Sequence, residues 1–290
     1  MKTAVYTTFY PTMLKYADEF LYSLAQQSEQ DFDLWISLDG LEPKQIKLPN
    51  KLKPIYYQNQ QAKNPIEIRK LALAEISAKY DAVVLVDSDD ILYPNRIKAA
   101  KKILEKYDVY ACSLDLIAEN GKDLGLKFIT ENQEDWLEFL SNKNVFGFSN
   151  TAYRTSILKD IINIPSQTIM MDWLVVLKAL VNKNAQLYFD SEIHMAYRQY
   201  ENNTNKIVSP LSAKNIKQAT NLLLKHHLIL NDELTWLEPF RGHFAKVKLF
   251  AKYIEEEANL AKYLKALNNK KEVFYWYEQI AYQELEYLWN

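Results

Sequence analysis

The pattern of apolar and polar positions predicts alternating strands and helices over the first part of the chain. Residues 82–86 are five consecutive small or apolar residues, three of them β-branched, which is typical of a short strand buried on both faces. Residues 3–9 and 32–38 are also rich in strand-forming residues, and residues 54–58 are a plausible further strand. Apolar positions from 13 to 24 recur at helical spacing.

A second helix begins at a clear start signal. Asn64 can serve as the N-cap, Pro65 occupies the first turn, and Glu67 is positioned for a capping box. This helix leads into the strand at 82–86. The order strand, helix, strand, strand, helix, strand predicts an α/β fold with a mostly parallel sheet and covering helices.

The alternation of predicted helices and strands continues after residue 94. It predicts a helix over 94–107 and a hairpin whose asparagine–glycine turn lies at Asn120 and Gly121. The further expected elements are strands at 109–117, 124–129, 145–153, 187–189 and 192–197, and helices at 131–140 and 172–182.

From Pro210 the pattern becomes helical and rich in Leu, Lys and Glu. We therefore expect an α/β domain at 1–208 and a helical region at 209–290. The run at 272–277 is too aromatic to leave in water. These helices are expected to pack on the α/β domain or on a second copy of it, as a homodimer; peripheral membrane contact through 209–290 is the alternative.

Three carboxylates follow the buried strand directly, at Asp87, Asp89 and Asp90. Acids at the carboxyl end of a core strand lie where open α/β sheets bind ligands. In an extended chain, Asp87 and Asp89 would leave on one side, within roughly 7 Å of each other. Ionised carboxylates that close repel unless one is protonated or a cation lies between them. A divalent cation held between the carboxylates and substrate phosphates would remove this repulsion. The alternative is that the three acids form a solvated turn before Pro94.

Composition narrows the function classes. The net charge of −2 over 290 residues does not favour nucleic acid as a partner. Only 5 residues are glycine, and no glycine-rich phosphate loop is present. A single cysteine, Cys112, and the lack of a signal-like or spanning segment predict a cytoplasmic protein, with the inner face of the membrane as one location. No metal-ligand spacing relates the histidines, which are His194, His226, His227 and His243.

Several stretches, taken in order, resemble the family 2 glycosyltransferases. They are VYTTFYP, LWISLDG, EIRKLALAEISAKYDAVVLVDSDDILYPNRI, GFSNTAYRTSIL, MMDWLVVLKAL and YRQYENNT, and they span roughly residues 3–204. An Asp-x-Asp motif alone is common, but the order and spacing of all six are specific. The resemblance implies a GT-A fold and metal-dependent, inverting transfer from a nucleotide-diphosphate sugar, with a UDP-sugar favoured, to a hydroxyl acceptor.

The resemblance also implies the metal and catalytic residues. Asp89 matches the carboxylate that coordinates a divalent cation, Mn²⁺ or Mg²⁺, on the donor diphosphate. Asp87 opens the same motif and would hold the ribose or assist the ion. Asp172 matches the general base, although an aspartate before an apolar helix is also a favoured N-cap.

The remaining carried-over residues would bind the donor. Thr8, Phe9 and Asp39 match the nucleoside-contacting edge, and Arg69 matches a basic residue of the donor site. Arg198 lies in a motif that often closes over the diphosphate or the acceptor. From the residues alone, Asp39 could be a turn residue, and Arg69 could be a solvated charge or a member of a surface ion pair.

The sequence departs from the family pattern at three places. A single acid, Asp39, precedes the glycine where two are common; Met171 stands where a glutamate is usual; and Tyr200 replaces a frequent histidine. Met171 and Tyr200 are the basis for an alternative function, that of a binding or scaffold protein with weakened catalysis. A haloacid-type phosphatase also has an Asp-x-Asp motif, but that motif follows the first strand of its fold, whereas here it follows the fourth. The phosphatase motif also needs a hydroxyl or valine residue two positions after its second aspartate, where this chain has Ile91.

The family resemblance implies that the acceptor is a saccharide, a lipid-linked glycan or a protein glycan, in surface polysaccharide or glycan biosynthesis.

Overall fold

The computed structural model describes residues 1–58, 61–201, 203, 207, 211–234, 238–270 and 276–281. These residues form two compact units, one of Met1–Trp136 and Asn144–Arg198, the other of Leu137–Lys143 and Gln199–Asn290. Pro210, the expected boundary at 208 and 209, and residues 272–275 of the aromatic run lie outside the described residues. The domain limits therefore stay a prediction.

A nine-stranded sheet forms the centre of the first unit, with the order β3-β2-β1-β4-β8-β6-β9-β5 and β7 paired to β6. The strands are β1 (Thr3–Phe9), β2 (Asp33–Leu38), β3 (Ile55–Tyr57), β4 (Ala82–Leu85), β5 (Ile91–Leu92), β6 (Val109–Ala118), β7 (Asp123–Phe128), β8 (Thr151–Arg154) and β9 (Leu187–Gln199). The α/β fold expected from the sequence is confirmed.

The sheet is mixed, which corrects the expectation of a mostly parallel one. Strands β3, β2, β1 and β4 are parallel neighbours, because helices cross over between them. Beyond β4 the described pairs of β8, β6, β7, β9 and β5 are antiparallel. The predicted strand at 145–153 is reduced to β8, and the two short strands expected at 187–197 form the single strand β9.

Strands β1 and β4 position the acidic residues. Every residue of both strands is buried, and the register pairs Thr3 with Ala82 and Tyr6 with Leu85. Since the two strands are parallel, their carboxyl ends meet at one edge of the sheet. The residues that follow each strand therefore lie together at that edge.

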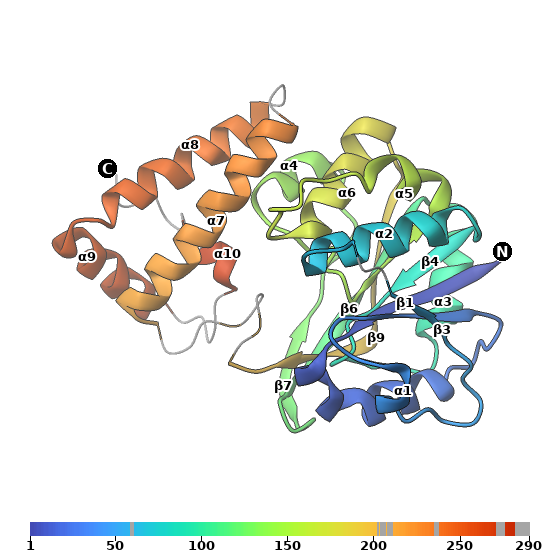
Figure 1. Ribbon diagram of the computed structural model, residues 1–290. Helices are drawn as coiled ribbons and strands as arrows, with labels where there is room; N and C mark the ends of the chain where they lie inside the picture. The colour runs from blue at the N-terminus through green and yellow to red at the C-terminus, as the bar shows by residue number, and fades with distance from the viewer. Residues whose placement is uncertain are drawn as a thin grey trace. The chain divides into compact units, whose positions relative to one another are not determined.

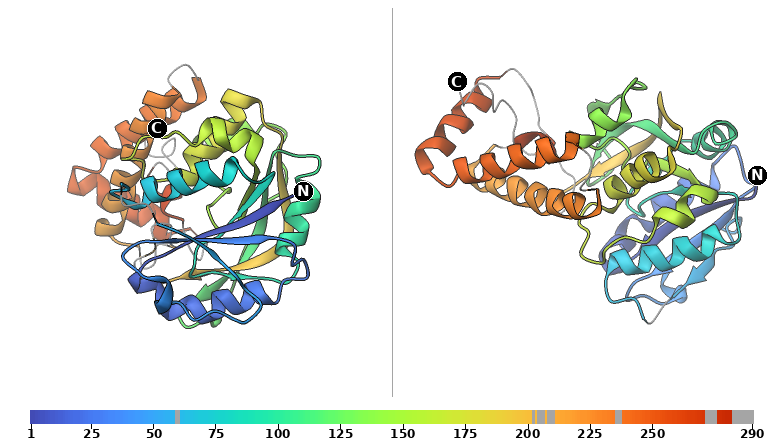
Figure 2. Two further views of the ribbon diagram at one scale, coloured as in Figure 1. Left: turned by 45° about the vertical axis from the view of Figure 1, so that its right-hand side comes forward. Right: turned by 90° about the horizontal axis from the view of Figure 1, so that it is seen from above.

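Helices cover both faces of this sheet. They are α1 (Ala17–Ala25), which follows the 3-10 helix η1 (Pro11–Tyr16), α2 (Pro65–Ser77), α3 (Arg96–Ile103), α5 (Thr155–Ile161) and α6 (Met171–Lys183). Helices α2, α5 and α6 lie side by side along one face, with α1 on the opposite face (Figures 1 and 2). Gln27, two residues after α1, accepts a hydrogen bond of 3.2 Å from the backbone N–H of Ile97, which connects this segment to the first turn of α3.

Helix α2 begins as the sequence predicts. Asn64 is the N-cap, and its side chain accepts a hydrogen bond of 2.9 Å from the backbone N–H of Glu67. The Glu67 carboxylate accepts from the backbone N–H of Lys63 at 2.7 Å, one residue earlier than a standard capping box requires. This start orients the helix that carries Arg69.

The second unit is helical. Its described helices are α7 (Ala213–Glu233), α8 (Glu238–Tyr253), α9 (Glu257–Asn268), the short α10 (Tyr277–Ile280) and most of α4 (Trp136–Asn142). Leu223, Val247 and Phe250 are fully buried, as the helical periodicity predicts, and Phe250 packs edge-on against Tyr263 at 4.6 Å between ring centroids. Among the described residues, no helix is both long and apolar enough to span a membrane.

Candidate functional site

The acidic residues form a turn at the end of β4, which we call the acidic turn (residues 87–90). The backbone N–H of Asp90 donates to the carbonyl of Asp87 at 3.3 Å, so the chain bends here and does not continue as an extended strand. The expectation that Asp87 and Asp89 share a side through strand alternation therefore does not hold. Asp87 is partly buried, Asp89 is 8% exposed and Asp90 is fully buried.

The acidic turn is attached to its surroundings by two serines. The backbone N–H of Asp87 donates to Ser149 Oγ at 2.7 Å, and Ser88 Oγ donates to the carbonyl of Thr8 at 2.8 Å. The first bond connects the turn to the loop before β8, and the second connects it to β1. The sequence pattern does not indicate a role for Ser149, because residues 145–153 resemble a strand. Gly147 and the asparagines on either side of it are the signal of a loop.

Arg69 and Asp87 form an ion pair at this edge. Arg69 Nη2 lies 2.8 Å from Asp87 Oδ1, and the guanidinium also lies over the Phe148 ring at 4.2 Å from its centroid. Burial raises the pKa of the Asp87 carboxyl, and the positive charge of Arg69 offsets this only in part. Arg69 is therefore paired with a carboxylate of the acidic turn and is not an unpaired solvated charge, while its role in donor binding stays a prediction.

Asp90 is a buried carboxyl whose role the sequence did not indicate. Its Oδ1 accepts a hydrogen bond of 2.8 Å from the backbone N–H of Arg198. Burial raises its pKa well above the usual value, and the charges of Asp89 and Asp87 raise it further. Acids accumulated this densely give the turn a negative field that a bound cation would relieve.

Asp172 lies in the first turn of α6. The N-cap position is Met170, which makes no side-chain cap bond, so Asp172 is not the N-cap residue, although its carboxylate interacts with N–H groups of the first turn. Asp172 Oδ2 accepts a hydrogen bond of 3.1 Å from Asn144 Nδ2. The backbone N–H groups of Trp173 and of Asp172 itself also stabilise the carboxylate.

The environment of Asp172 tunes it toward neutral pH. Burial is the largest effect and raises the pKa of the Asp172 carboxyl to about 6, although the backbone N–H of Trp173 lowers this pKa. The charge of Asp87 raises the pKa further, and the charge of Arg69 lowers it. Asp172 therefore lies within electrostatic range of Asp87 and Arg69. A carboxyl with such a pKa can act as a base near pH 7.

A small cavity of about 10 Å³ lies beside Asp172. Its walls include Gly147, Phe148, Tyr153 and Met171, and its volume is about that needed by one water molecule. A Cβ on Gly147 would lie 3.8 Å from Asp172 Oδ2 and 3.3 Å from Asn150 Oδ1. Glycine at this position therefore keeps the space beside the carboxylate open.

The residues expected to contact the nucleoside lie at the carboxyl ends of β1 and β2. Thr8 lies at the end of β1, with Oγ1 3.2 Å from the Tyr6 hydroxyl, and Asp39 follows β2 with its N–H on the carbonyl of Phe9 at 2.9 Å. Phe9 is fully buried, and its ring packs against Phe20 at 5.8 Å between centroids. Phe9 thus reaches this edge through its backbone while its ring belongs to the core.

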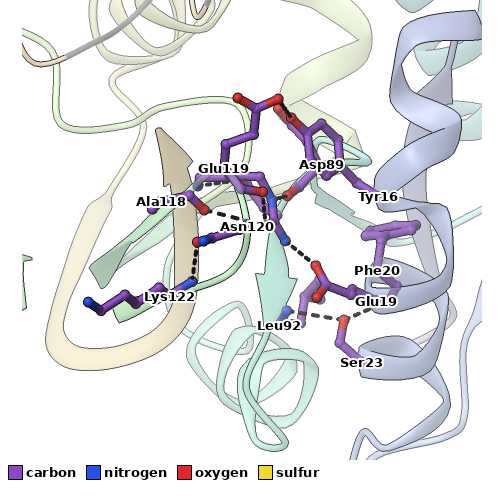
Figure 3. Close-up of polar contacts among 12 residues, drawn as sticks. Tyr16, Glu19, Phe20, Ser23, Asp89, Leu92, Ala118, Glu119, Asn120 and Lys122 are labelled. Atoms are coloured by element: carbon purple, nitrogen blue, oxygen red, sulfur yellow. Dashed lines mark hydrogen bonds and ion pairs between the residues drawn. The ribbon is translucent and has the colours of Figure 1, made fainter. Parts of the chain in front are cut away.

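Arg198 lies at the end of β9, fully buried, and not in an open loop. It donates from its backbone and its side chain to the acidic turn. Figure 3 shows the surroundings of this contact, with Asp89, Glu119, Tyr16 and Glu19 gathered in one place. The structure thus brings Arg198 to the site, beneath the turn and away from solvent.

The carboxylates fit a cation that substrate phosphates help to hold. No group of three or more His, Cys, Asp or Glu side chains able to bind a metal occurs in the part of the chain that the structure describes. Mg²⁺ and similar ions are commonly held by one or two carboxylates together with substrate phosphates, without an all-protein cage. The raised pKa of Asp87 and Asp90 is consistent with such a cation, which Asp89 and Asp87 would hold.

Comparison with known families identifies the chain. The profile described as "Glycosyl transferase family 2" matches residues 5–162, more than half of the sequence. The chain belongs to glycosyl transferase family 2. It is a glycosyltransferase with a GT-A fold, and Arg69 and the acidic turn lie within the matched segment, whereas Asp172 and Arg198 lie beyond it.

Solved structures of similar fold carry nucleotide sugars. Staphylococcus aureus TarS 1-349 in complex with UDP-GlcNAc is 21% identical with a TM-score of 0.58, over 93% of this chain and 77% of that one. The mannosyltransferase PcManGT from Pyrobaculum calidifontis, in complex with GDP-Man and Mn²⁺, is 13% identical with a TM-score of 0.61, over 93% and 76%. The chain covers 46% of the longer TarS structure. No curated protein sequence matches.

Proposed function

We propose that this glycosyltransferase moves a sugar from a nucleoside-diphosphate donor to a hydroxyl acceptor, with inversion and with a divalent cation. The observation that carries the proposal is the arrangement around Asp172. A carboxyl with a pKa of about 6 interacts with the Arg69–Asp87 pair beside an acidic turn. A base poised near neutrality next to a cation and phosphate site is what this reaction needs.

The donor side of the proposal uses the edge formed by β1, β2 and β4. Thr8 and Asp39 would contact the nucleoside, with Phe9 supporting this edge from the core. Arg69, held by Asp87, would face the donor diphosphate. Of the two neighbours described above, one is in complex with UDP-GlcNAc and the other with GDP-Man and Mn²⁺, and we favour a UDP-sugar here.

Asp89 and Asp87 would hold Mn²⁺ or Mg²⁺. When bound, the cation supplies Lewis-acid stabilisation for the departing nucleoside diphosphate. The partial burial of both carboxylates strengthens their electrostatic interactions compared with those in water.

The acceptor side uses Asp172. Its carboxylate would accept the proton of the attacking hydroxyl, and Asn144 orients the carboxylate through Oδ2. Attack on the face of the sugar opposite the leaving group inverts the anomeric centre. The acceptor would be a saccharide, a lipid-linked glycan or a protein glycan, in the synthesis of polysaccharide or another glycan in the cytoplasm.

A second candidate is a binding protein of the same fold. Met171 is buried and lines the cavity beside Asp172, so the helix start offers one carboxylate where the family commonly has two. Such a site could bind nucleotide and turn over poorly.

Release of nucleoside diphosphate from a panel of UDP- and GDP-sugars tests the proposal, with and without Mn²⁺ and with candidate acceptors. We expect cation-dependent release of UDP by the unaltered protein. A matched control is Asp160→Asn, since Asp160 is an exposed aspartate paired with Lys183 at 2.6 Å. Tight nucleotide binding without turnover of any donor would favour the binding protein instead.

A further inference from the structure

Arg198 is buried and forms two hydrogen bonds with the acidic turn. Its backbone N–H donates to Asp90 Oδ1 at 2.8 Å, and its Nε donates to the carbonyl of Asp89 at 2.6 Å. One residue thus bonds both a side chain and a main-chain carbonyl of the turn. The turn is separated from Arg198 by more than a hundred positions in the sequence, so this contact exists only in the folded chain.

The other end of the guanidinium is bound to two further elements. Nη1 donates to the carbonyl of Glu119 at 2.8 Å, in the turn between β6 and β7, and Nη2 lies 2.5 Å from Glu19 Oε2 on α1. The guanidinium also lies over the Tyr16 ring at 4.7 Å from its centroid. Figure 3 shows these partners converging from the helix, the hairpin and the acidic turn.

The hairpin turn is itself held in place. Glu119 Oε1 lies 2.5 Å from Lys15 Nζ and accepts from the Tyr16 hydroxyl at 3.2 Å. Gly121 adopts a φ of +81°, and a Cβ there would lie 3.4 Å from Glu19 Oε1 and 3.7 Å from Arg198 Nη1. The Arg198–Glu19 pair therefore packs closely against this turn.

A direct role in ligand contact does not fit this geometry. Arg198 is 0% exposed, and its three guanidinium nitrogens all donate within the protein. Buried charge is costly unless it is paired and hydrogen-bonded, and breaking such an arrangement leaves a charge uncompensated. Releasing Arg198 to contact a diphosphate would break several of these bonds at once.

We infer that Arg198 is a positioning residue that, with Glu19 and the hairpin turn at 118–121, sets the place of the acidic turn and so of the cation-binding carboxylates. The inference rests on the proposed function, because it concerns the cation site proposed there. Groups that orient metal ligands through hydrogen bonds affect metal affinity without touching the metal. A guanidinium is suited to this, since its planar fork can hold several carbonyls at fixed angles, which an ammonium cannot.

The test measures Mn²⁺ affinity in the presence of UDP, by the loss of the electron paramagnetic resonance signal of free Mn²⁺. Arg198→Lys keeps the charge and loses the fork, and we expect the apparent Kd for Mn²⁺ to rise about 10-fold or more. Glu19→Gln removes only the ion pair and should act in the same direction with a smaller effect. Because the Glu19 side chain is 51% exposed, this variant is expected to fold even if Arg198→Lys does not.

Arg154→Lys is a matched control. Arg154 also binds backbone carbonyls, from Nε to Leu104 and from Nη2 to Glu105, both at 2.6 Å, but on another part of the sheet. It should leave the Mn²⁺ affinity unchanged. Saturating Mn²⁺ should restore the UDP affinity of Arg198→Lys and Glu19→Gln, which a general loss of folding would not allow.

Two outcomes separate this inference from the proposed function. If the unaltered protein binds Mn²⁺ with UDP and both Arg198→Lys and Glu19→Gln retain its affinity, the positioning role is overturned and the proposed function stands. If the unaltered protein binds UDP equally well with and without Mn²⁺, the cation part of the proposed function fails, and this inference fails with it.

Discussion

At the scale of single residues, burial sets the protonation behaviour of the carboxyls in the site. Asp87, Asp90 and Asp172 all have a raised pKa, and burial is the largest cause for each. The ionised forms are therefore costly in the free protein, and a cation or an incoming proton would relieve that cost. Arg69 moderates the effect at Asp87 and Asp172 but does not cancel it.

The first prediction concerns the base. Asp172→Asn keeps the shape of the side chain but cannot accept a proton. We expect UDP binding within about threefold of the unaltered protein and a turnover lower by on the order of 10²-fold or more. Steady-state kinetics and calorimetry measure the two quantities, and Asp160→Asn should change neither. Normal turnover per folded molecule would remove Asp172 from the catalytic role.

The second prediction concerns pH and stability. The folded-state pKa of Asp172, about 6, lies above the unfolded value, so the contribution of Asp172 to the free energy of unfolding falls as pH rises from about 4 through 6. Asp172→Asn lacks this loss. Relative to the unaltered protein, it should gain about 1–3 kcal/mol in the free energy of unfolding above pH 7 and much less below pH 4. Urea unfolding at several pH values tests this; a pH-independent difference would contradict it.

The third prediction concerns the cation ligand. Asp89→Ala should abolish the Mn²⁺-dependent part of UDP binding and leave the fold intact, because the expected role of Asp89 is ligation. Calorimetry of UDP with and without Mn²⁺ measures the effect, with circular dichroism as the check on folding. Asp18→Ala, at an exposed position in the first turn of α1, serves as the control. Unchanged Mn²⁺-dependent affinity would exclude Asp89 from the site.

At the scale of elements, the β6–β7 hairpin has a role beyond completing the sheet. Its turn supplies the carbonyl of Glu119 to Arg198 and the Glu119 carboxylate to Lys15 and Tyr16. The asparagine–glycine signal predicts a tight turn, and the positive φ of Gly121 confirms it. The hairpin thereby connects α1 to the acidic turn.

The fourth prediction compares two glycines of this hairpin. Gly121→Ala and Gly125→Ala both force a side chain into a positive φ, at about 1 kcal/mol each. At Gly121 the Cβ would make ordinary van der Waals contacts with Glu19 and Arg198, and the backbone strain would fall on the turn that bonds Arg198, whereas at Gly125 nothing lies within 4 Å. Both should lower the melting temperature, and only Gly121→Ala should weaken Mn²⁺ binding with UDP. Equal Mn²⁺ affinities for the two variants would contradict a link between this turn and the site.

At the scale of the whole molecule, the chain forms two compact units that are not consecutive in sequence. Residues 137–143 belong to the helical unit although they lie between strands of the sheet unit. Within that helical unit, Glu138 Oε1 lies 3.8 Å from His243 Nε2, and Leu140 is fully buried. The helical unit therefore depends on a segment supplied from the middle of the chain.

The fifth prediction follows from this connection. A chain ending at Arg198 keeps residues 137–143 but loses the helices that form a unit with them. Leu140 and its neighbours would be exposed, and we expect an aggregating protein, measured by light scattering and size-exclusion chromatography. A soluble, monomeric and stable truncation that has lost binding to anionic phospholipid vesicles would instead indicate that the helical unit is a membrane attachment.

The sequence by itself determined the local elements of the core and the order of the chemistry along them. Residues 3–9 form the predicted strand, Asn64 caps the predicted helix, and the acids of 87–90 follow a buried strand. These features follow from hydrophobic periodicity, capping and turn chemistry, which act over a few residues. The family, the expected donor edge and the expected role of Arg69 came instead from the resemblance of six motifs to a known family, and the donor edge stays a prediction.

Only the tertiary structure decided what the remaining residues do. Arg198 binds Glu19, 179 positions away, and Phe9 turns its ring into the core. The pKa of Asp172 depends on burial and on Asp87, which lie beyond any local pattern. Such properties arise from which side chains surround a group and how much water reaches it, and both are set when distant segments pack together.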